Sequence, residues 1–238
     1  MSADRLRHAL ACEWRHWRHA RRWRRERRAR WGEYTLADFE RLGCLFVHVP
    51  KTGGVSVARA LFGHLAGGHR TVDEYLVLYG HLRFARLFRF AFVRDPFTRL
   101  ESAFRFLKAG GMNDDDRRWA EEHLAGIDDL EQFCVSWLTP ENARSWVHFR
   151  PQADFVCDAT GRLRVDFVGK FERLAEDFDA VCRRLGRRAE LPHLNRSAPR
   201  RRDPRETLPD AARRRVAEVY RRDFELFGYS VERAQGQA

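Results

Sequence analysis

A lysine followed by two glycines and flanked by hydroxyls interrupts an apolar run near residue 50. Residues 45–58 read LFVHVPKTGGVSVA. The polar residues of this interruption are Lys51, Thr52, Gly53, Gly54 and Ser56. A strand that turns through such a loop into a helix directs the first N–H groups of the helix at an anion. Only three of the 45 Lys and Arg residues are lysine, so a lysine here favours a compact point charge over a planar guanidinium. The segment predicts a phosphate-type site, and an ordinary turn before a helix is the alternative.

A second polar cluster follows the apolar segment 88–93. Arg94 and Asp95 precede Pro96, which cannot continue a strand ladder, so the strand is expected to end here. Arg99 and Ser102 fall in the first turns of the helix expected next. A guanidinium and a hydroxyl can converge on an anion, which makes Arg94 and Ser102 candidate ligands. Asp95 is expected to organise the turn, and an Asp95–Arg99 structural pair is the alternative.

Strands and helices are expected to alternate around these loops. This order predicts a single α/β domain over residues 33–238, with a central parallel sheet flanked by helices. The expected strands are 44–49, 88–93 and 165–168, and the expected helices are 54–62, 97–107, 117–147, 174–185 and 210–227. Residues 186–209 read as a basic loop.

Most of the excess positive charge lies in an N-terminal arm. Residues 1–32 carry 11 arginines against three acidic residues, whereas the whole chain has a net charge of +11. Leu6, Leu10, Trp14 and Trp17 fall on one face of an expected helix. Such a helix can lie on an acidic membrane or another polyanion. Packing of its tryptophans on the domain is the interpretation favoured here.

The cysteines and the hydropathy indicate a compartment. The five cysteines are odd in number and contain no CxxC pair, so we expect reduced thiols, with a Cys134–Cys157 bridge as the alternative. No stretch approaches the ~20 apolar residues of a membrane span, and arginines interrupt every apolar stretch near the N-terminus. We therefore expect a cytoplasmic protein that is able to bind peripherally at the inner membrane face.

Together the two polar segments resemble a known pair of motifs. PKTGGVS at 50–56 followed by VRDPFTRLESAF at 93–104 is similar to the cofactor-binding motifs of the sulfotransferases. The closer likeness is to the carbohydrate branch, which includes the heparan 2-O- and chondroitin sulfotransferases. Further similar segments lie at 148–152, 166–172, 194–197 and 220–229. The family often has threonine where this chain has Val55.

The resemblance implies a P-loop nucleotide-hydrolase-like sulfotransferase fold and a function. The implied reaction transfers a sulfuryl group from 3′-phosphoadenosine 5′-phosphosulfate (PAPS) to a hydroxyl of a carbohydrate or glycoconjugate, with no metal expected. In this family the first motif holds the 5′-phosphosulfate and the second holds the 3′-phosphate. The implied cofactor-binding residues are Pro50, Lys51, Thr52, Gly53, Gly54, Val55, Ser56, Arg94, Ser102, Asn195 and Arg196. Lys51 would also stabilise charge on the bridge oxygen.

The acceptor hydroxyl needs a base, and neutral histidine suits that role at neutral pH. His81 is the first candidate, because heparan 2-O-sulfotransferases place their base in a similar Gly-His context. His148 and Glu74 are alternatives, and His48 reads as structural. Acceptor contacts are expected from His148, Arg150 and Arg83, with Arg86 and the 200–202 arginines as further candidates.

Three other functions fit parts of the sequence. A nucleotide-dependent kinase would need a magnesium-holding acid and a glycine-first loop; Asp95 is available, but the glycines here follow the lysine. A nucleic-acid-binding protein fits the basic arm but not the nearly neutral domain, so nucleic acid is not an expected partner. A non-catalytic nucleotide-binding module would keep the loops without turnover.

Overall fold

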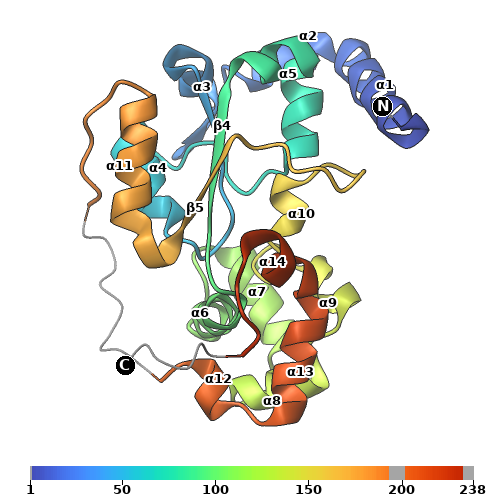
Figure 1. Ribbon diagram of the computed structural model, residues 1–238, viewed down its shortest axis with the longest axis vertical. Helices are drawn as coiled ribbons and strands as arrows, with labels where there is room; N and C mark the ends of the chain where they lie inside the picture. Colours follow the sequence, from blue (N-terminus) through green and yellow to red (C-terminus); the bar gives the residue numbers. More distant parts are fainter. Residues whose placement is uncertain (1, 193–201, 233–238) are drawn as a thin grey trace. The chain divides into compact units, whose positions relative to one another are not determined.

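Three parallel strands form the sheet that carries the candidate loops. The computed structural model describes residues 2–192 and 202–232. β3 (Cys44–Val47), β4 (Phe88–Val93) and β5 (Phe167–Lys170) pair in the order β3-β4-β5, and both pairings are parallel. Parallel neighbours need crossover connections, which the helices between them supply. The predicted α/β class with a central parallel sheet is confirmed (Figure 1).

The strands are mostly apolar, and β3 is buried throughout, as is typical of parallel strands in an α/β sheet. Phe46 pairs with Phe90 across β3 and β4, and their rings stack with centroids 5.1 Å apart. The strand predicted at 88–93 is confirmed, whereas β3 ends two residues earlier than predicted. The prediction of 165–168 for the third strand was wrong by two residues. Asp166 precedes β5, and its carboxylate accepts a hydrogen bond from the Arg89 N–H at 2.9 Å.

The chain divides into two compact units. The first comprises residues 1–93 and 152–195 and contains the sheet; the second comprises residues 94–151 and 196–238. Helices α11 and α4 lie side by side in the first unit, to one side of β4 (Figure 1). The α-helices of the first unit are α1 (Ala3–Arg18), α2 (Ala20–Glu26), α3 (Ala37–Leu42), α4 (Gly54–Phe62), α5 (Val72–Arg86), α10 (Ala153–Val156) and α11 (Leu174–Arg184). A short hairpin, β1 (Arg30–Trp31) with β2 (Tyr34–Thr35), joins α2 to α3. The predicted boundary at residue 32 stays a prediction.

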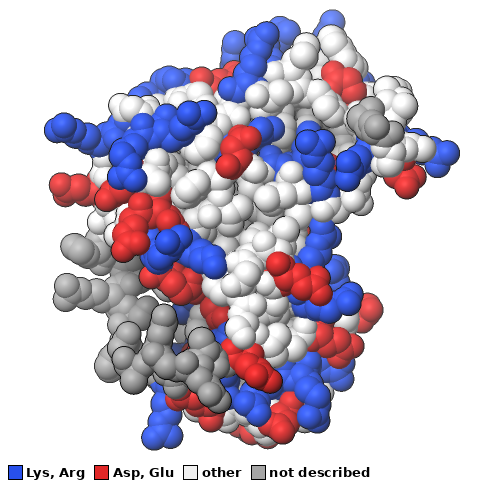
Figure 2. All heavy atoms as spheres, viewed as in Figure 1, with Lys and Arg blue, Asp and Glu red and all other residues white. Residues whose placement is uncertain are grey.

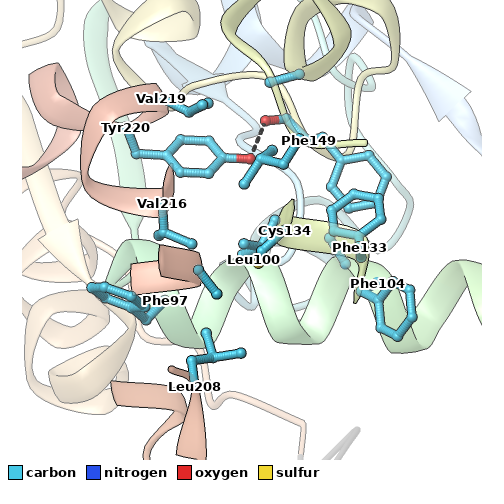
Figure 3. Packing of buried hydrophobic residues seen from close by; sticks show 14 of the residues in the cluster. Phe97, Leu100, Phe104, Phe133, Cys134, Phe149, Leu208, Val216, Val219 and Tyr220 are labelled. Carbon is cyan, nitrogen blue, oxygen red and sulfur yellow. Dashed lines mark hydrogen bonds between the residues drawn. The ribbon is translucent and has the colours of Figure 1, made fainter. Parts of the chain in front are cut away.

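In the described part of the second unit, helices pack around an aromatic core (Figure 3). Its helices are α6 (Pro96–Lys108), α7 (Asp114–His123), α8 (Leu130–Ser136), α9 (Pro140–Ser145), α12 (Pro204–Thr207), α13 (Asp210–Val219) and α14 (Arg221–Phe227). The helix predicted over 97–107 is confirmed as part of α6, and its apolar residues are buried from Phe97 to Leu107. Tyr220, between α13 and α14, donates a hydrogen bond from its hydroxyl to the Phe149 carbonyl at 2.7 Å.

Three predicted segments differ from the structure in where helices begin and end. The single helix predicted over 117–147 is three short helices, because Gly126 adopts a left-handed φ of 74° and Pro140 starts a new helix. The helix predicted over 210–227 breaks at Tyr220. The predicted loop 186–209 contains α12, and residues 193–201 lie outside the described part of the chain.

The N-terminal helix packs through a different face from the one predicted. His8, Cys12 and His16 recur at a spacing of four and turn toward α5; Cys12 is buried, and the His16 ring bonds the Val77 carbonyl at 2.8 Å. The Leu/Trp face is exposed instead, with Trp14 at 58% and Trp17 at 70%. The favoured interpretation, packing of the tryptophans on the domain, was therefore wrong for these two residues. Hydrophobicity alone does not choose the buried face of this helix, because polar contacts to α5 fix it.

Two predictions about chemistry and hydropathy can also be checked. All five cysteines are free thiols and buried, so the alternative Cys134–Cys157 bridge is not formed. Within residues 2–192 and 202–232, no helix combines the length and apolar content that crossing a bilayer requires.

Candidate functional site

The loop between β3 and α4 holds an unusual backbone. Lys51 has a φ of 66° and Gly53 a φ of 79°, both in the left-handed region. Glycine adopts this region readily, whereas a lysine does so only where its surroundings enforce it. A Cβ on Gly53 would lie 2.8 Å from Leu174 Cδ2, so α11 leaves room for glycine only. The chain therefore makes a tight turn directly before a helix, and the packing around it holds the turn in place.

The start of α4 lies directly after this turn. Its N-cap, Gly53, makes no side-chain cap. The nearest hydroxyl, on the fully buried Thr52, donates to the Val49 carbonyl at 2.9 Å and so holds the loop together. Ser56 is also buried within the first turn. The first N–H groups of a helix and the positive end of its dipole attract an anion at such a start.

Two histidines lie against this loop. The ring of His48 packs so closely on Gly54 that a Cβ there would lie 2.1 Å from its Cδ2 atom. The ring of His69 hydrogen-bonds the His48 carbonyl at 2.9 Å, and the two ring centroids are 4.3 Å apart. His48 is buried and supports the helix start, as expected of a structural residue. His69 is only half-buried, so part of its ring faces solvent beside the turn.

The second motif lies at the start of α6. Asp95 is the N-cap and accepts hydrogen bonds from the N–H groups of Phe97 and Thr98, so its predicted role in the turn is confirmed. The Arg94 guanidinium donates from Nε to the Thr98 hydroxyl at 3.0 Å. Ser102 lies one turn beyond Thr98 on the same face of the helix. Arg94 and Ser102 thus share one side of α6, as an anion site needs.

The partner of Asp95 is not Arg99. Arg99 is almost completely buried and donates to the carbonyls of His148 and Arg150, at 3.1 and 2.7 Å. Asp95 instead forms a two-pronged ion pair with the buried Arg205, so the alternative Asp95–Arg99 pair was wrong. Burial lowers the pKa of Arg205, but hydrogen bonding to Asp95 and the nearby carboxylates raise it above its ordinary value. The pair fixes the helix start that carries Arg94.

His81 and Arg83 lie beyond a kink in α5. Gly80 interrupts the helix with a φ of 71° and a ψ of 160°. Both the His81 N–H and its ring Nδ1 bond one oxygen of Glu13 on α1, at 3.1 and 2.9 Å. Arg83 donates to Glu40 on α3 at 3.1 Å. These contacts are with helices that precede β3, whereas the Lys51 loop follows β3. The role of His81 as base stays a prediction.

The remaining predicted residues are distributed over both units. His148 is buried in the second unit, where its ring bonds Asp116 at 3.1 Å and meets the edge of Phe106. Arg150 is half-buried beside it in sequence. In the first unit, Pro50 is buried and Val55 is half-buried. Asn195 and Arg196 lie outside the described residues.

Comparison with known proteins decides the family. The profile of the sulfotransferase family matches residues 36–230. The chain belongs to the sulfotransferase family. It is 27% identical to carbohydrate sulfotransferase 12 of Xenopus laevis over 201 residues, which cover 70% of this chain and 47% of that protein. It is 28% identical to carbohydrate sulfotransferase 11 of Rattus norvegicus over 196 residues, 71% of this chain and 54% of that protein. No solved structure matches the chain significantly.

The match locates what this sulfotransferase chain shares with its relatives. The Lys51 loop, the Gly80 kink and the Arg94 motif all fall inside residues 36–230, whereas α1 and α2 precede that region. The chain spans about half the length of the curated relatives it matches.

Sequence reasoning missed two features of the candidate site. His69 follows a Gly67-Gly68 pair and precedes the capping box of Thr71 and Glu74, a sign of an ordered loop before a helix. That signal places His69 near the start of α5 but not against His48. Arg205 carries no signal, because it is one of many arginines in a basic segment.

Proposed function

We propose that this protein transfers a sulfuryl group from PAPS to a hydroxyl of a carbohydrate or glycoconjugate. The observation that carries the proposal is the left-handed Lys51 placed before the uncapped start of α4. Membership of the sulfotransferase family supports the reaction, and its similarity to two carbohydrate sulfotransferases supports a carbohydrate acceptor.

The residues of the first loop suit the charge that such a reaction develops. PAPS supplies a sulfuryl group whose departure leaves negative charge on the phosphate side of the broken bond. The Lys51 ammonium and the first N–H groups of α4 can stabilise that charge without moving. Arg94 and Ser102 are the residues that we propose for the 3′-phosphate. Asn195 and Arg196 stay further proposed ligands.

Two histidines compete for the role of base. His81 is the base that the family resemblance implies, and Glu13 orients its ring through Nδ1. His69 lies beside the loop, oriented by its bond to the His48 carbonyl. In each case the imidazole nitrogen remote from that bond, Nε2, would take the proton of the acceptor hydroxyl.

The acceptor contacts proposed from the sequence differ in setting. Arg150 is half-buried, Arg83 is exposed but engaged by Glu40, and His148 is buried against Asp116. We propose Arg150 and Arg83 as contacts for an acidic glycan. Because His148 is buried, we propose that it stabilises the segment that carries Arg150.

The test is transfer of labelled sulfate from PAPS to a panel of glycans and small alcohols, with and without a chelator. We expect transfer to a glycan that continues in the chelator. Lys51→Ala should lower kcat by about 10²–10³-fold, the usual effect of removing one such electrostatic group. Arg59→Ala, which removes a cation further along α4 that pairs with Glu33, is the matched control and should keep full activity.

Each rival function predicts a different result. Tight binding of 3′-phosphoadenosine 5′-phosphate without transfer to any acceptor would indicate a non-catalytic module. Magnesium-dependent phosphate transfer from ATP would indicate a kinase. For the base, whichever of His81→Ala and His69→Ala abolishes turnover while nucleotide binding persists identifies the catalytic histidine.

We also propose that α1 attaches the protein to the cytoplasmic face of an anionic membrane. The exposed face of α1 carries four apolar side chains at helical spacing, Leu6, Leu10, Trp14 and Trp17, between 47% and 70% exposed. Arginines border this face, and Arg18 lies over the Trp14 ring at 4.9 Å. An apolar face bordered by cations favours the interface of anionic lipid.

Sedimentation with lipid vesicles tests this attachment. The full chain should bind phosphatidylglycerol vesicles at least tenfold more tightly than phosphatidylcholine vesicles, and Trp14→Ser/Trp17→Ser should remove most of the binding. Leu82→Ser, which changes an even more exposed apolar residue on α5, should leave the binding intact. Equal binding to vesicles and to a soluble polyanion such as heparin, indifferent to the tryptophans, would refute a membrane surface.

A further inference from the structure

The face of α1 that turns inward carries a cluster of metal-ligating atoms. His8 and Cys12 are one helical turn apart, and Asp73 lies opposite them in the first turn of α5. Cys12 is 3% exposed and the His8 side chain 15% exposed. The cluster belongs to the first unit and takes no part in the proposed sulfuryl transfer.

The three donor atoms converge on one point. His8 Nε2 lies 3.5 Å from Cys12 Sγ and 3.1 Å from Asp73 Oδ1, and all three atoms lie within 4.8 Å of one another. The same ring nitrogen faces both the sulfur and the carboxylate. A single N–H can donate a good hydrogen bond to the sulfur or to the carboxylate, but not to both. A cation placed among the three donor atoms can bind all of them.

Both helices hold their donors in place. Asp73 Oδ2 accepts a hydrogen bond from the Ala159 N–H at 2.9 Å, which turns the buried Oδ1 toward His8 and Cys12. A capping box of Thr71 and Glu74 fixes the first turn of α5 around Asp73. The donor positions therefore come from regular helix, which limits the rearrangement needed to bind a cation.

The donor set indicates which cation fits. An imidazole nitrogen, a thiolate and one carboxylate oxygen suit the borderline-soft Zn²⁺ rather than Mg²⁺ or Ca²⁺, which prefer oxygen alone. Three protein ligands leave a fourth position for water. A cavity of about 750 Å³ that both His8 and Cys12 line can admit that water.

We propose that His8, Cys12 and Asp73 form a zinc site that fastens α1 to α5. Binding forms a Zn–S bond at Cys12 and releases the thiol proton to solvent. The site would anchor the helix that carries the exposed tryptophans. This proposal does not depend on the proposed sulfotransferase activity.

Cobalt titration of the full-length protein tests the site. Co²⁺ should bind at one equivalent with a thiolate-to-cobalt absorption in the near ultraviolet, and Zn²⁺ should displace it. Cys12→Ser should abolish the absorption, and His8→Gln and Asp73→Asn should each weaken Zn²⁺ binding at least tenfold. Cys182→Ser, a change to another buried cysteine away from the cluster, should change nothing.

The unaltered protein gives an independent measurement. X-ray absorption of the zinc-loaded wild-type chain should show one sulfur at about 2.3 Å and nitrogen or oxygen neighbours at about 2.0–2.2 Å. Absence of a sulfur neighbour, or a cobalt absorption that persists in Cys12→Ser, would overturn the proposal.

Discussion

Lys51 is the residue on which the proposed chemistry depends most. Its side chain is a lysine in an arginine-rich chain, and its backbone is left-handed where only glycine is at ease. A strained backbone at a candidate site indicates that the surrounding structure maintains it for a purpose. The left-handed Lys51 backbone forms part of the turn that leads into α4.

Replacing Lys51 by glycine should separate stability from activity. Lys51→Gly relieves the left-handed strain and should raise the free energy of unfolding by about 1 kcal/mol, while turnover falls by about 100-fold or more. Lys51→Ala should lose activity to the same extent without the gain in stability, because alanine keeps the strain. Urea unfolding and initial rates measure the two effects. A Lys51→Gly protein no more stable than Lys51→Ala would show that the turn is unstrained.

Residue types revealed the candidate anion loops but not every neighbour. Lys51, Arg94 and Ser102 could be found because each follows a strand in a recognisable order. His69 could not, since its closeness to His48 depends on how residues 63–71 return to the sheet. Asp95 was correctly expected to organise the turn before α6, but its partner Arg205 is too distant in sequence for spacing to identify.

At the scale of elements, α1 shows what periodicity can and cannot establish. The spacing of its apolar residues correctly predicted a helix. The same spacing suggested the wrong buried face, because the helix docks through His8, Cys12 and His16 and leaves the tryptophans exposed. The helix predicted over 210–227 was too long, because periodicity does not reveal a break between two helices. At the break, Tyr220 makes a tertiary hydrogen bond to the Phe149 carbonyl.

Glu13 should contribute to docking of α1 in a pH-dependent way. Burial raises its pKa, but hydrogen bonds from the His81 N–H and ring lower it below its ordinary value of 4.5. A carboxylate with a lowered pKa stabilises the fold above about pH 4.5, and the contribution is lost as the pH falls below that value. Glu13→Gln should cost about 1 kcal/mol at pH 7, and the difference from wild type should shrink in acid.

Chemical unfolding between pH 3 and pH 7 measures this effect. Asp4→Asn, which changes a fully exposed acid on the same helix, is the matched control and should cost nothing measurable. A cost for Glu13→Gln that is constant over this range would mean that the charge of Glu13 is unimportant.

On the scale of the whole molecule, the fold class followed from the alternation of apolar strands and amphipathic helices. That nucleic acid is not a partner stays a prediction. Figure 2 shows basic and acidic side chains interspersed over the face drawn, rather than gathered in a single-sign patch. Most of the net charge lies in residues 1–32, ahead of the family match.

Nucleotide binding should stabilise the whole folded chain by mass action. At 100 times its Kd, 3′-phosphoadenosine 5′-phosphate should add about 2.7 kcal/mol to the free energy of unfolding. An analogue without the 3′-phosphate should bind more weakly and stabilise less at the same concentration. If Arg94 holds that phosphate, Arg94→Met should abolish the difference between the two nucleotides. Arg105→Met removes a half-exposed arginine of α6 that pairs with Glu101 and should preserve the difference. Thermal shifts over a range of nucleotide concentrations measure it, and equal discrimination in both variants would exclude Arg94 as the 3′-phosphate ligand.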